Sequence, residues 1–210
     1  MRRFVAAIAA AALATLAGGC SSSTGARPAP AGQRTSSPAG GARSATAEAG
    51  VPQCAARALV LRPGAFVVPM TGEHAEIYAL ANRGPVTCTL SGYPQVVLYD
   101  AGGAALPFRY AMGGGAYVTS RGPVTVVLAR GASAYVLVAK YRCDLGVAHN
   151  ATAIRLTLPT ASGEAFAGRE AVATAGAGGL SYCRGGQHDP GQVITVSPVE
   201  PTQQATRNLR

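Results

Sequence analysis

Cys88 is the side chain in the middle of this sequence that could do covalent chemistry. It lies in the segment 82–94, NRGPVTCTLSGYP, between two strand-like stretches. A catalytic cysteine needs a thiolate, usually beside a histidine, and oxidation to a disulfide would remove the thiol. The histidines all lie outside this segment: His74, His149 and His188. We therefore expect a structural corner, in which Asn82 and Gly84 make a turn because both tolerate φ > 0.

Other potentially catalytic or metal-binding side chains do not complete a motif. Ser133 in GASAY falls one residue short of G-x-S-x-G, and a nucleophile elbow needs a helix after the strand, where we expect a second strand. His74 and Glu76 would share one face of a strand, and His188-Asp189 would lie in a loop. Exposed polar residues on a sheet account for both pairs, so we expect no catalytic residue, no metal and no cofactor.

Cys20 is the candidate for covalent modification. The residues before it form a positive start, MRR, an apolar run too short to cross a bilayer, and small residues next to the cysteine. This pattern predicts a lipoprotein signal peptide at residues 1–19, with Cys20 carrying the lipid and anchoring the protein on the outer face of the cell membrane. The alternative is an ordinary secretory signal that leaves Cys20 as a spare thiol.

The composition changes after Cys20 and again near the end of the chain. Residues 20–50 are small, polar and proline-rich without an apolar period, which predicts a disordered tether with a reach on the order of 30 Å. Residues 51–199 should form the folded domain, and residues 200–210 a flexible tail. The formal net charge is +9, but the basic residues are scattered and have no interleaved aromatic stripe, so we expect no nucleic-acid partner.

Short strand-like segments punctuated by turns follow one another through the folded region. Residues 153–158, AIRLTL, alternate cleanly between apolar and polar side chains, and no stretch has the period of an amphipathic helix. This predicts an all-β fold, an antiparallel β-sandwich with an immunoglobulin-like layout. The expected strands lie at 58–61, 65–68, 73–82, 93–100, 105–110, 115–120, 124–129, 133–141, 153–158, 171–175 and 192–199.

Four cysteines remain for this domain: Cys54, Cys88, Cys143 and Cys183. An exported protein can oxidise them, and three connectivities are possible. Pairing neighbours would close loops of roughly 35 and 40 residues, and each bond would stabilise the fold by about 3–4 kcal/mol.

Residues 54–198 resemble a family of actinobacterial secreted proteins and lipoproteins, the domain of unknown function DUF4232. The resemblance lies in Cys54, in N-x-G followed by C-T-L-S-G-Y-P-Q-V at 82–96, in the later L-A-R-G-A-S-A at 128–134, and in Cys143 and Cys183. It implies a β-sandwich and the neighbour pairing of the cysteines. It implies no activity.

The segment Phe108–Tyr117 is the expected place of contact with a partner, if there is one. Three successive glycines lie among side chains common at binding hot spots, namely Arg109, Tyr110, Met112 and Tyr117. The alternative is that its rings cap one end of the core.

Three functions are compatible with these features. The first is a non-catalytic, lipid-anchored β-sandwich that interacts with an envelope protein or polymer. The second is a carrier or sensor of a small ligand, which would need a concave polar pocket. The third is a secreted hydrolase, which would need an acid/base pair in a cleft.

Overall fold

The computed structural model describes residues 50–63, 65–67, 71–143, 147–158, 166–172, 179–186 and 188–208. The predicted signal peptide, Cys20 and the tether lie outside these residues. Among the described residues, no helix is long and apolar enough to cross a membrane.

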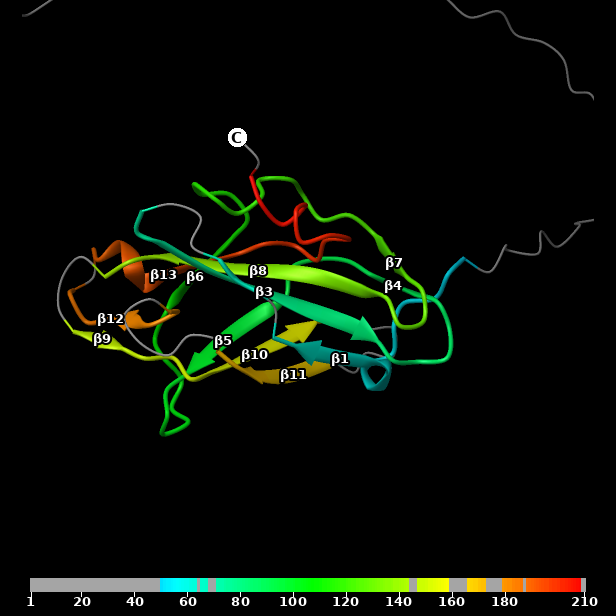
Figure 1. Ribbon diagram of the computed structural model, residues 1–210, viewed down its shortest axis with the longest axis horizontal. Helices are drawn as coiled ribbons and strands as arrows, with labels where there is room; N and C mark the ends of the chain where they lie inside the picture. Colours follow the sequence, from blue (N-terminus) through cyan, green and yellow to red (C-terminus); the bar gives the residue numbers. More distant parts are fainter. Residues whose placement is uncertain are drawn as a thin grey trace, which may run out of the picture. The chain divides into compact units, whose positions relative to one another are not determined.

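The larger of two main sheets has the strand order β1-β3-β8-β13-β6, with β2 paired to β3 (Figure 1). Its centre is the long antiparallel pair of β3 and β8, which runs from Glu73 opposite Tyr141 to Ala81 opposite Ser133. The strands of this sheet are β1 (Leu59–Arg62), β2 (Phe66–Val67), β3 (Glu73–Asn82), β6 (Arg109–Met112), β8 (Ser133–Tyr141) and β13 (Val193–Val196).

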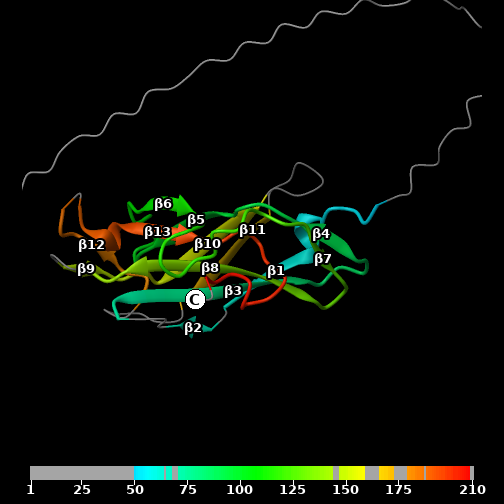
Figure 2. The same ribbon diagram turned by 90° about the horizontal axis from the view of Figure 1, so that it is seen from above.

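The second sheet has the order β11-β10-β5, and two short ribbons complete the fold. Its strands are β5 (Gln95–Tyr99), β10 (Ala153–Leu158) and β11 (Phe166–Ala171); the ribbons pair β4 (Cys88–Leu90) with β7 (Val126–Leu128) and β9 (Ala148–His149) with β12 (Tyr182–Cys183). Figure 2 shows β2 and β3 on one side of the domain and β5 on the other. The predicted all-β, sandwich-like fold is confirmed. Among the described strands, β13 pairs in parallel with β6, and the isolated bridge between Gln53 and Thr89 is also parallel. The immunoglobulin-like layout stays a prediction.

The core lies between the two sheets. Ile154, Leu156 and Leu158 of β10 point inward and are fully buried, as their alternation predicts, and they pack with Tyr78 and Val136 of the larger sheet. Burying one such aliphatic side chain contributes about 1.5–3 kcal/mol.

The strand β3 is buried on both faces, which explains why its sequence does not alternate. Its outer face carries Ile77, which packs in a second apolar cluster with Val118 and Leu137. The C-terminal segment lies beside this cluster: Thr206 is fully buried, and Val118 forms a bridge with Arg207. The predicted flexible tail is therefore wrong for residues 200–208, which are hydrogen-bonded to the domain.

Both predicted disulfides are present. Cys54 is joined to Cys88, and Cys143 to Cys183. Cys88 begins β4, and the Cys54 N–H donates to the Thr89 carbonyl, so the first bond fastens the start of the domain to this strand. The segment around Cys88 is structural.

The turn before Cys88 is held by a side chain and not by positive φ. Asn82 is fully buried; its Nδ2 donates to the carbonyls of Val86 and Leu128 at 2.8 and 3.0 Å, and its Oδ1 accepts from the Gly84 N–H at 2.9 Å. Gly84 has no positive φ, and it is required because a Cβ there would lie 2.8 Å from the Cβ of Ala58. The predicted reason for these two residues was wrong.

Three predicted strands differ from the structure. Of the predicted strand 105–110, only Arg109 and Tyr110 lie in a strand, β6, which continues to Met112. Residues 115–120 form a turn with one isolated bridge, because their hydrogen bonds go to the C-terminal segment and to a local turn. The strand β11 ends at Ala171, and residues 173–175 of the predicted strand lie outside the described residues.

Candidate functional site

The predicted contact segment divides into buried and exposed residues. Phe108 is 7% exposed and packs edge-to-face on Tyr182, and Tyr117 is half-buried against the second apolar cluster. Arg109 is exposed, as are Tyr110 at 38% and Met112 at 59%. Both predicted roles therefore occur within one segment: its ends are scaffold, and β6 between them presents side chains to solvent.

Tyr110 is only partly available to a partner. Its hydroxyl accepts the N–H of Leu98 at 3.4 Å, so it satisfies a donor of the neighbouring strand β5. Its ring lies 6.5 Å from that of Phe108 in an edge-to-face arrangement, and burial raises the pKa of its hydroxyl. Of Tyr110 and Met112, Met112 is therefore the side chain that is more available for contact with a partner.

A group of three side chains, which we call the Tyr99–arginine cluster, lies on the outer face of the second sheet. Arg155 of β10 and Arg169 of β11 are directly opposite each other in the register. Their guanidinium carbons lie 5.5 and 5.0 Å from the ring centroid of Tyr99, at the end of β5. Both distances are typical of cation–π contacts.

The cluster places two positive charges side by side on this face. Both arginines are exposed, and within the described residues neither is hydrogen-bonded or ion-paired to an acceptor. Like charges directly opposite across two strands repel each other. Arg155 cannot turn inward, because Ile154 and Leu156 occupy the inner face of the same strand. Two guanidinium groups therefore keep their donors facing solvent.

An open groove of about 450 Å³ lies along the C-terminal segment, where Arg121 and Arg207 contribute to its lining. Arg121 donates to the Ala205 carbonyl at 2.9 Å and to Thr119 Oγ1 at 3.4 Å, and the Arg207 guanidinium lies over Tyr117. These contacts fasten the segment to the domain, so the groove's arginines are engaged in structural bonds.

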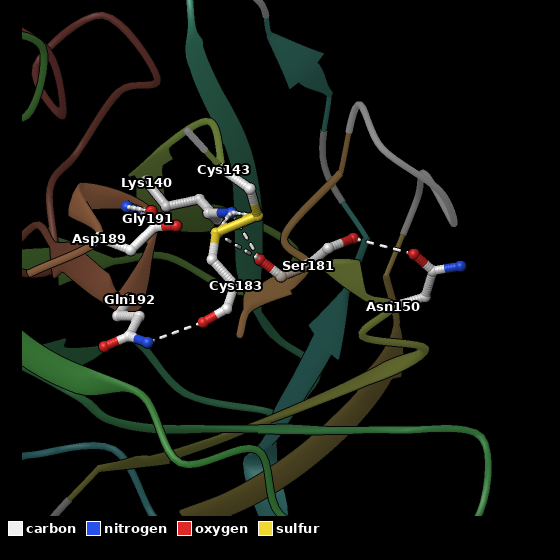
Figure 3. Close-up of a disulfide and its surroundings, with 8 residues drawn as sticks. All are labelled: Lys140, Cys143, Asn150, Ser181, Cys183, Asp189, Gly191 and Gln192. Atoms are coloured by element: carbon white, nitrogen blue, oxygen red, sulfur yellow. Dashed lines mark hydrogen bonds between the residues drawn. A yellow bond between two sulfur atoms is a disulfide. The ribbon is translucent and has the colours of Figure 1, made fainter. Parts of the chain in front are cut away.

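Lys140 is a buried cation beside the disulfide Cys143–Cys183 (Figure 3). It is 3% exposed, and its Nζ donates to the Ser181 carbonyl and lies 3.3 Å from Cys183 Sγ and 3.7 Å from Cys143 Sγ. Burial lowers the pKa of Lys140 to about 8, and the nearby carboxylate of Asp189 opposes this shift. The ammonium therefore stays largely protonated at neutral pH.

The residues around this lysine hold the segment 189–192 against the disulfide. Asp189 Oδ1 accepts the Gly191 N–H at 2.9 Å, and Gln192 Nε2 donates to the Cys183 carbonyl at 2.7 Å. Gly191 has to be glycine, because a Cβ there would overlap Cys183 Sγ. Lys140 thus contacts Ser181 and Cys183, which lie 41 and 43 positions away in the chain, and sequence spacing does not reveal such contacts.

The two pairs considered as metal ligands, His74 with Glu76 and His188 with Asp189, do not join a larger group of ligands among the described residues. Within the described ranges no group of three or more histidine, cysteine, aspartate or glutamate side chains could hold a metal. Glu76 is 1% exposed, and its Oε2 accepts the Tyr78 hydroxyl. Burial and the adjacent Glu76 raise the pKa of Tyr78. Ser133 begins β8 directly after the turn, so the strand–turn–helix geometry of a nucleophile elbow does not form there.

Residues 54–200 match the family model of a domain of unknown function, DUF4232. The chain belongs to this family. The DUF4232 match spans both disulfides, the Tyr99–arginine cluster and Lys140, and it ends where the C-terminal segment begins. Searches of curated proteins and of solved structures each returned no match.

The Tyr99–arginine cluster was not predicted from the sequence. The alternation of 153–158 predicts that Arg155 points outward, which is correct. Its meeting with Arg169 and Tyr99 depends on the register of three strands, and no local pattern encodes that register.

Proposed function

We propose that this protein is a lipid-anchored, extracytoplasmic binding module that holds an acidic polymer of the cell envelope on the outer face of β5, β10 and β11. The predicted lipid on Cys20 and the predicted tether would keep the domain near the membrane surface. The two disulfides support an oxidising, extracytoplasmic location.

The observation that carries this proposal is the Tyr99–arginine cluster. Arginine binds carboxylate and phosphate groups through two parallel N–H donors, and both guanidinium groups are exposed and have no acceptor among the residues that the structure describes. The tyrosine ring restricts both guanidinium groups, so less side-chain entropy is lost when an anion binds. A polymer with repeated acidic groups can engage both arginines at once.

The surroundings of the cluster favour a polymer over a lipid surface. The neighbouring outward positions are small, polar or half-buried: Gln95, Val97, Ala153, Thr157, Ala167 and Ala171. Among the described residues, the large exposed apolar side chains lie outside β5, β10 and β11. An extended chain can lie along such a face, whereas insertion into a bilayer needs exposed apolar side chains.

Binding is tested with the soluble form of the chain, residues 20–210 with Cys20→Ser. Its retention is measured on immobilised polygalacturonate, a carboxylate polymer, on poly(glycerol phosphate), and on vesicles of anionic lipid. We expect Arg155→Gln/Arg169→Gln to weaken polymer binding about thirtyfold, because each of the two lost charge-assisted pairs removes on the order of 1 kcal/mol. The control is Arg83→Gln/Arg130→Gln, which removes the same charge from exposed sites elsewhere.

Equal weakening by the two double variants would mean that only net charge matters, and the proposed site would be wrong. Preferential binding to vesicles would replace the polymer with lipid headgroups. Binding that is instead lost with Met112→Ser would transfer the partner surface to the exposed edge strand β6.

The anchor is tested separately on cells. We expect the membrane fraction to contain a chain that starts at Cys20 and carries added acyl mass, and Cys20→Ser to release the protein. An unmodified soluble wild-type chain would contradict the anchor without affecting the binding face.

A further inference from the structure

The two disulfides of this domain differ in their electrostatic surroundings. Cys143–Cys183 has the ammonium of Lys140 within 3.7 Å of both sulfur atoms. For Cys54–Cys88, within the part of the chain that the structure describes, no lysine or arginine nitrogen makes a hydrogen bond to either sulfur. One bond therefore has a cation in place to stabilise a thiolate, and the other does not.

The two disulfides also differ in access. Cys54 is fully buried and Cys88 is 3% exposed. In the second bond, Cys183 is fully buried, and the backbone of Gly191 packs directly against its Sγ. Cys143 is partly exposed. The partly exposed Cys143 is therefore the half of the bond that an external thiolate would attack, and the buried Cys183 would be the leaving group.

We propose that Cys143–Cys183 is a thiol-exchange site, at which an extracytoplasmic thiol attacks Cys143 and Lys140 stabilises the departing Cys183 thiolate (Figure 3). A leaving thiol departs faster when its pKa is lowered, and a neighbouring lysine ammonium lowers it. Lys140 contacts the leaving sulfur directly and acts on it through its charge, without forming or breaking a covalent bond.

The exchange takes place in two steps, in which the bonds and electrons balance. In the first step, the incoming thiolate forms an S–S bond with Cys143 Sγ while the Cys143–Cys183 bond breaks. The electron pair of the broken bond stays on Cys183 Sγ, beside Lys140. A second thiolate attacks the incoming sulfur, releases Cys143 as a thiolate, and leaves as an oxidised disulfide. Two external thiols are thereby oxidised, and one protein disulfide is reduced by two electrons.

The charges around Lys140 are compatible with this role. Asp189 lies on the segment that packs against the disulfide, and its carboxylate favours the protonated ammonium. His74 lies opposite Lys140 in the register of β3 and β8. Asp189 thus helps to keep the Lys140 ammonium protonated at neutral pH, against the effect of burial. The ammonium can then stabilise the Cys183 thiolate by its charge.

The test follows both bonds in the same molecule. The soluble form with Cys20→Ser retains four cysteines, and it is incubated with glutathione, a monothiol, or with dithiothreitol, a dithiol, then quenched with acid, alkylated and mapped by mass spectrometry. We expect Cys143–Cys183 to open at least about tenfold faster than Cys54–Cys88 with either probe, and the trapped glutathione to sit on Cys143.

The variant Lys140→Met should slow this opening and shift its equilibrium with the thiol about tenfold toward the disulfide, which is about 30 mV for a two-electron couple. Lys140→Arg keeps a cation and should retain most of the effect. The Cys54–Cys88 bond is the internal control and should respond to neither variant.

Three results would overturn this proposal. Opening of both bonds at one rate would mean that exchange occurs through global unfolding. Glutathione trapped on Cys183 would reverse the assigned roles. If a folded Lys140→Met variant shows unchanged kinetics and an unchanged equilibrium, Lys140 has no role in the exchange. The comparison of the two bonds uses the wild type alone, so it remains a test even if the variant does not fold.

Discussion

Lys140 should make the stability of this protein rise with pH in the alkaline range. Burial lowers its pKa from the usual 10.5 to about 8 in the folded state. Between these two values the unfolded chain holds a proton that the folded chain has released, so the free energy of unfolding increases with pH. The interval spans about 2.5 pH units at about 1.36 kcal/mol each, which gives about 3 kcal/mol. Below pH 8 both states are protonated, and this contribution is flat.

The measurement compares the wild type with Lys140→Met, both as the soluble form with Cys20→Ser. Urea unfolding is followed by circular dichroism from pH 7 to 10.5. The difference between the two free energies of unfolding should grow by about 3 kcal/mol in favour of the wild type across this range. Tyrosine titration is common to both proteins and cancels in the difference.

A direct readout does not depend on the variant. Lys140 is the chain's single lysine, so labelling with ε-¹³C lysine gives one NMR resonance whose titration reports its pKa in the folded state. A midpoint near 10.5, or a stability difference that does not change with pH, would refute the argument that Lys140 is desolvated.

Three further predictions concern stability and are measured by urea unfolding of the soluble form. Tyr78→Phe removes the hydroxyl that donates to Glu76, and it should cost about 1.5–3 kcal/mol because the acceptor is a buried carboxylate; an effect below ~0.5 kcal/mol would contradict this. Deletion of residues 201–210 should lower the free energy of unfolding by about 2–4 kcal/mol, because it uncovers the second apolar cluster around Ile77. If the segment were a flexible tail, its deletion would not change the stability. Replacing Cys54 and Cys88 by serine should cost about 4 kcal/mol, as expected for a separation of 34 residues, and unchanged stability would mean that the loop is constrained by other contacts.

The local patterns of the sequence were sufficient for the strands that have one buried face. In residues 153–158 the two-residue period fixes which side chains point inward, and Ile154, Leu156 and Leu158 are fully buried. The family resemblance supported the pairing of Cys54 with Cys88 and of Cys143 with Cys183, which the structure confirms. The exposure of Met112 and the burial of Phe108 were left open, because both residue types occur in cores and at binding surfaces.

The C-terminal segment shows why composition can mislead. Residues 201–208 are polar and have no apolar period, which is typical of a loose tail. The segment is ordered because its backbone is hydrogen-bonded to residues 117 and 119 and because Arg121 reaches the Ala205 carbonyl. Contacts of this kind join positions more than eighty residues apart, and no window of sequence contains them.

The sequence by itself determined the strand-rich fold, the inward faces of its regular strands and the family. Only the tertiary structure decided where the charged side chains meet. Tyr99, Arg155 and Arg169 come together because three strands share one register, and Lys140 reaches Cys183 across forty-three positions because β8 ends beside the ribbon that carries it. The period of a strand states which face a side chain occupies, but the neighbour on that face is chosen by the global packing that pairs distant strands.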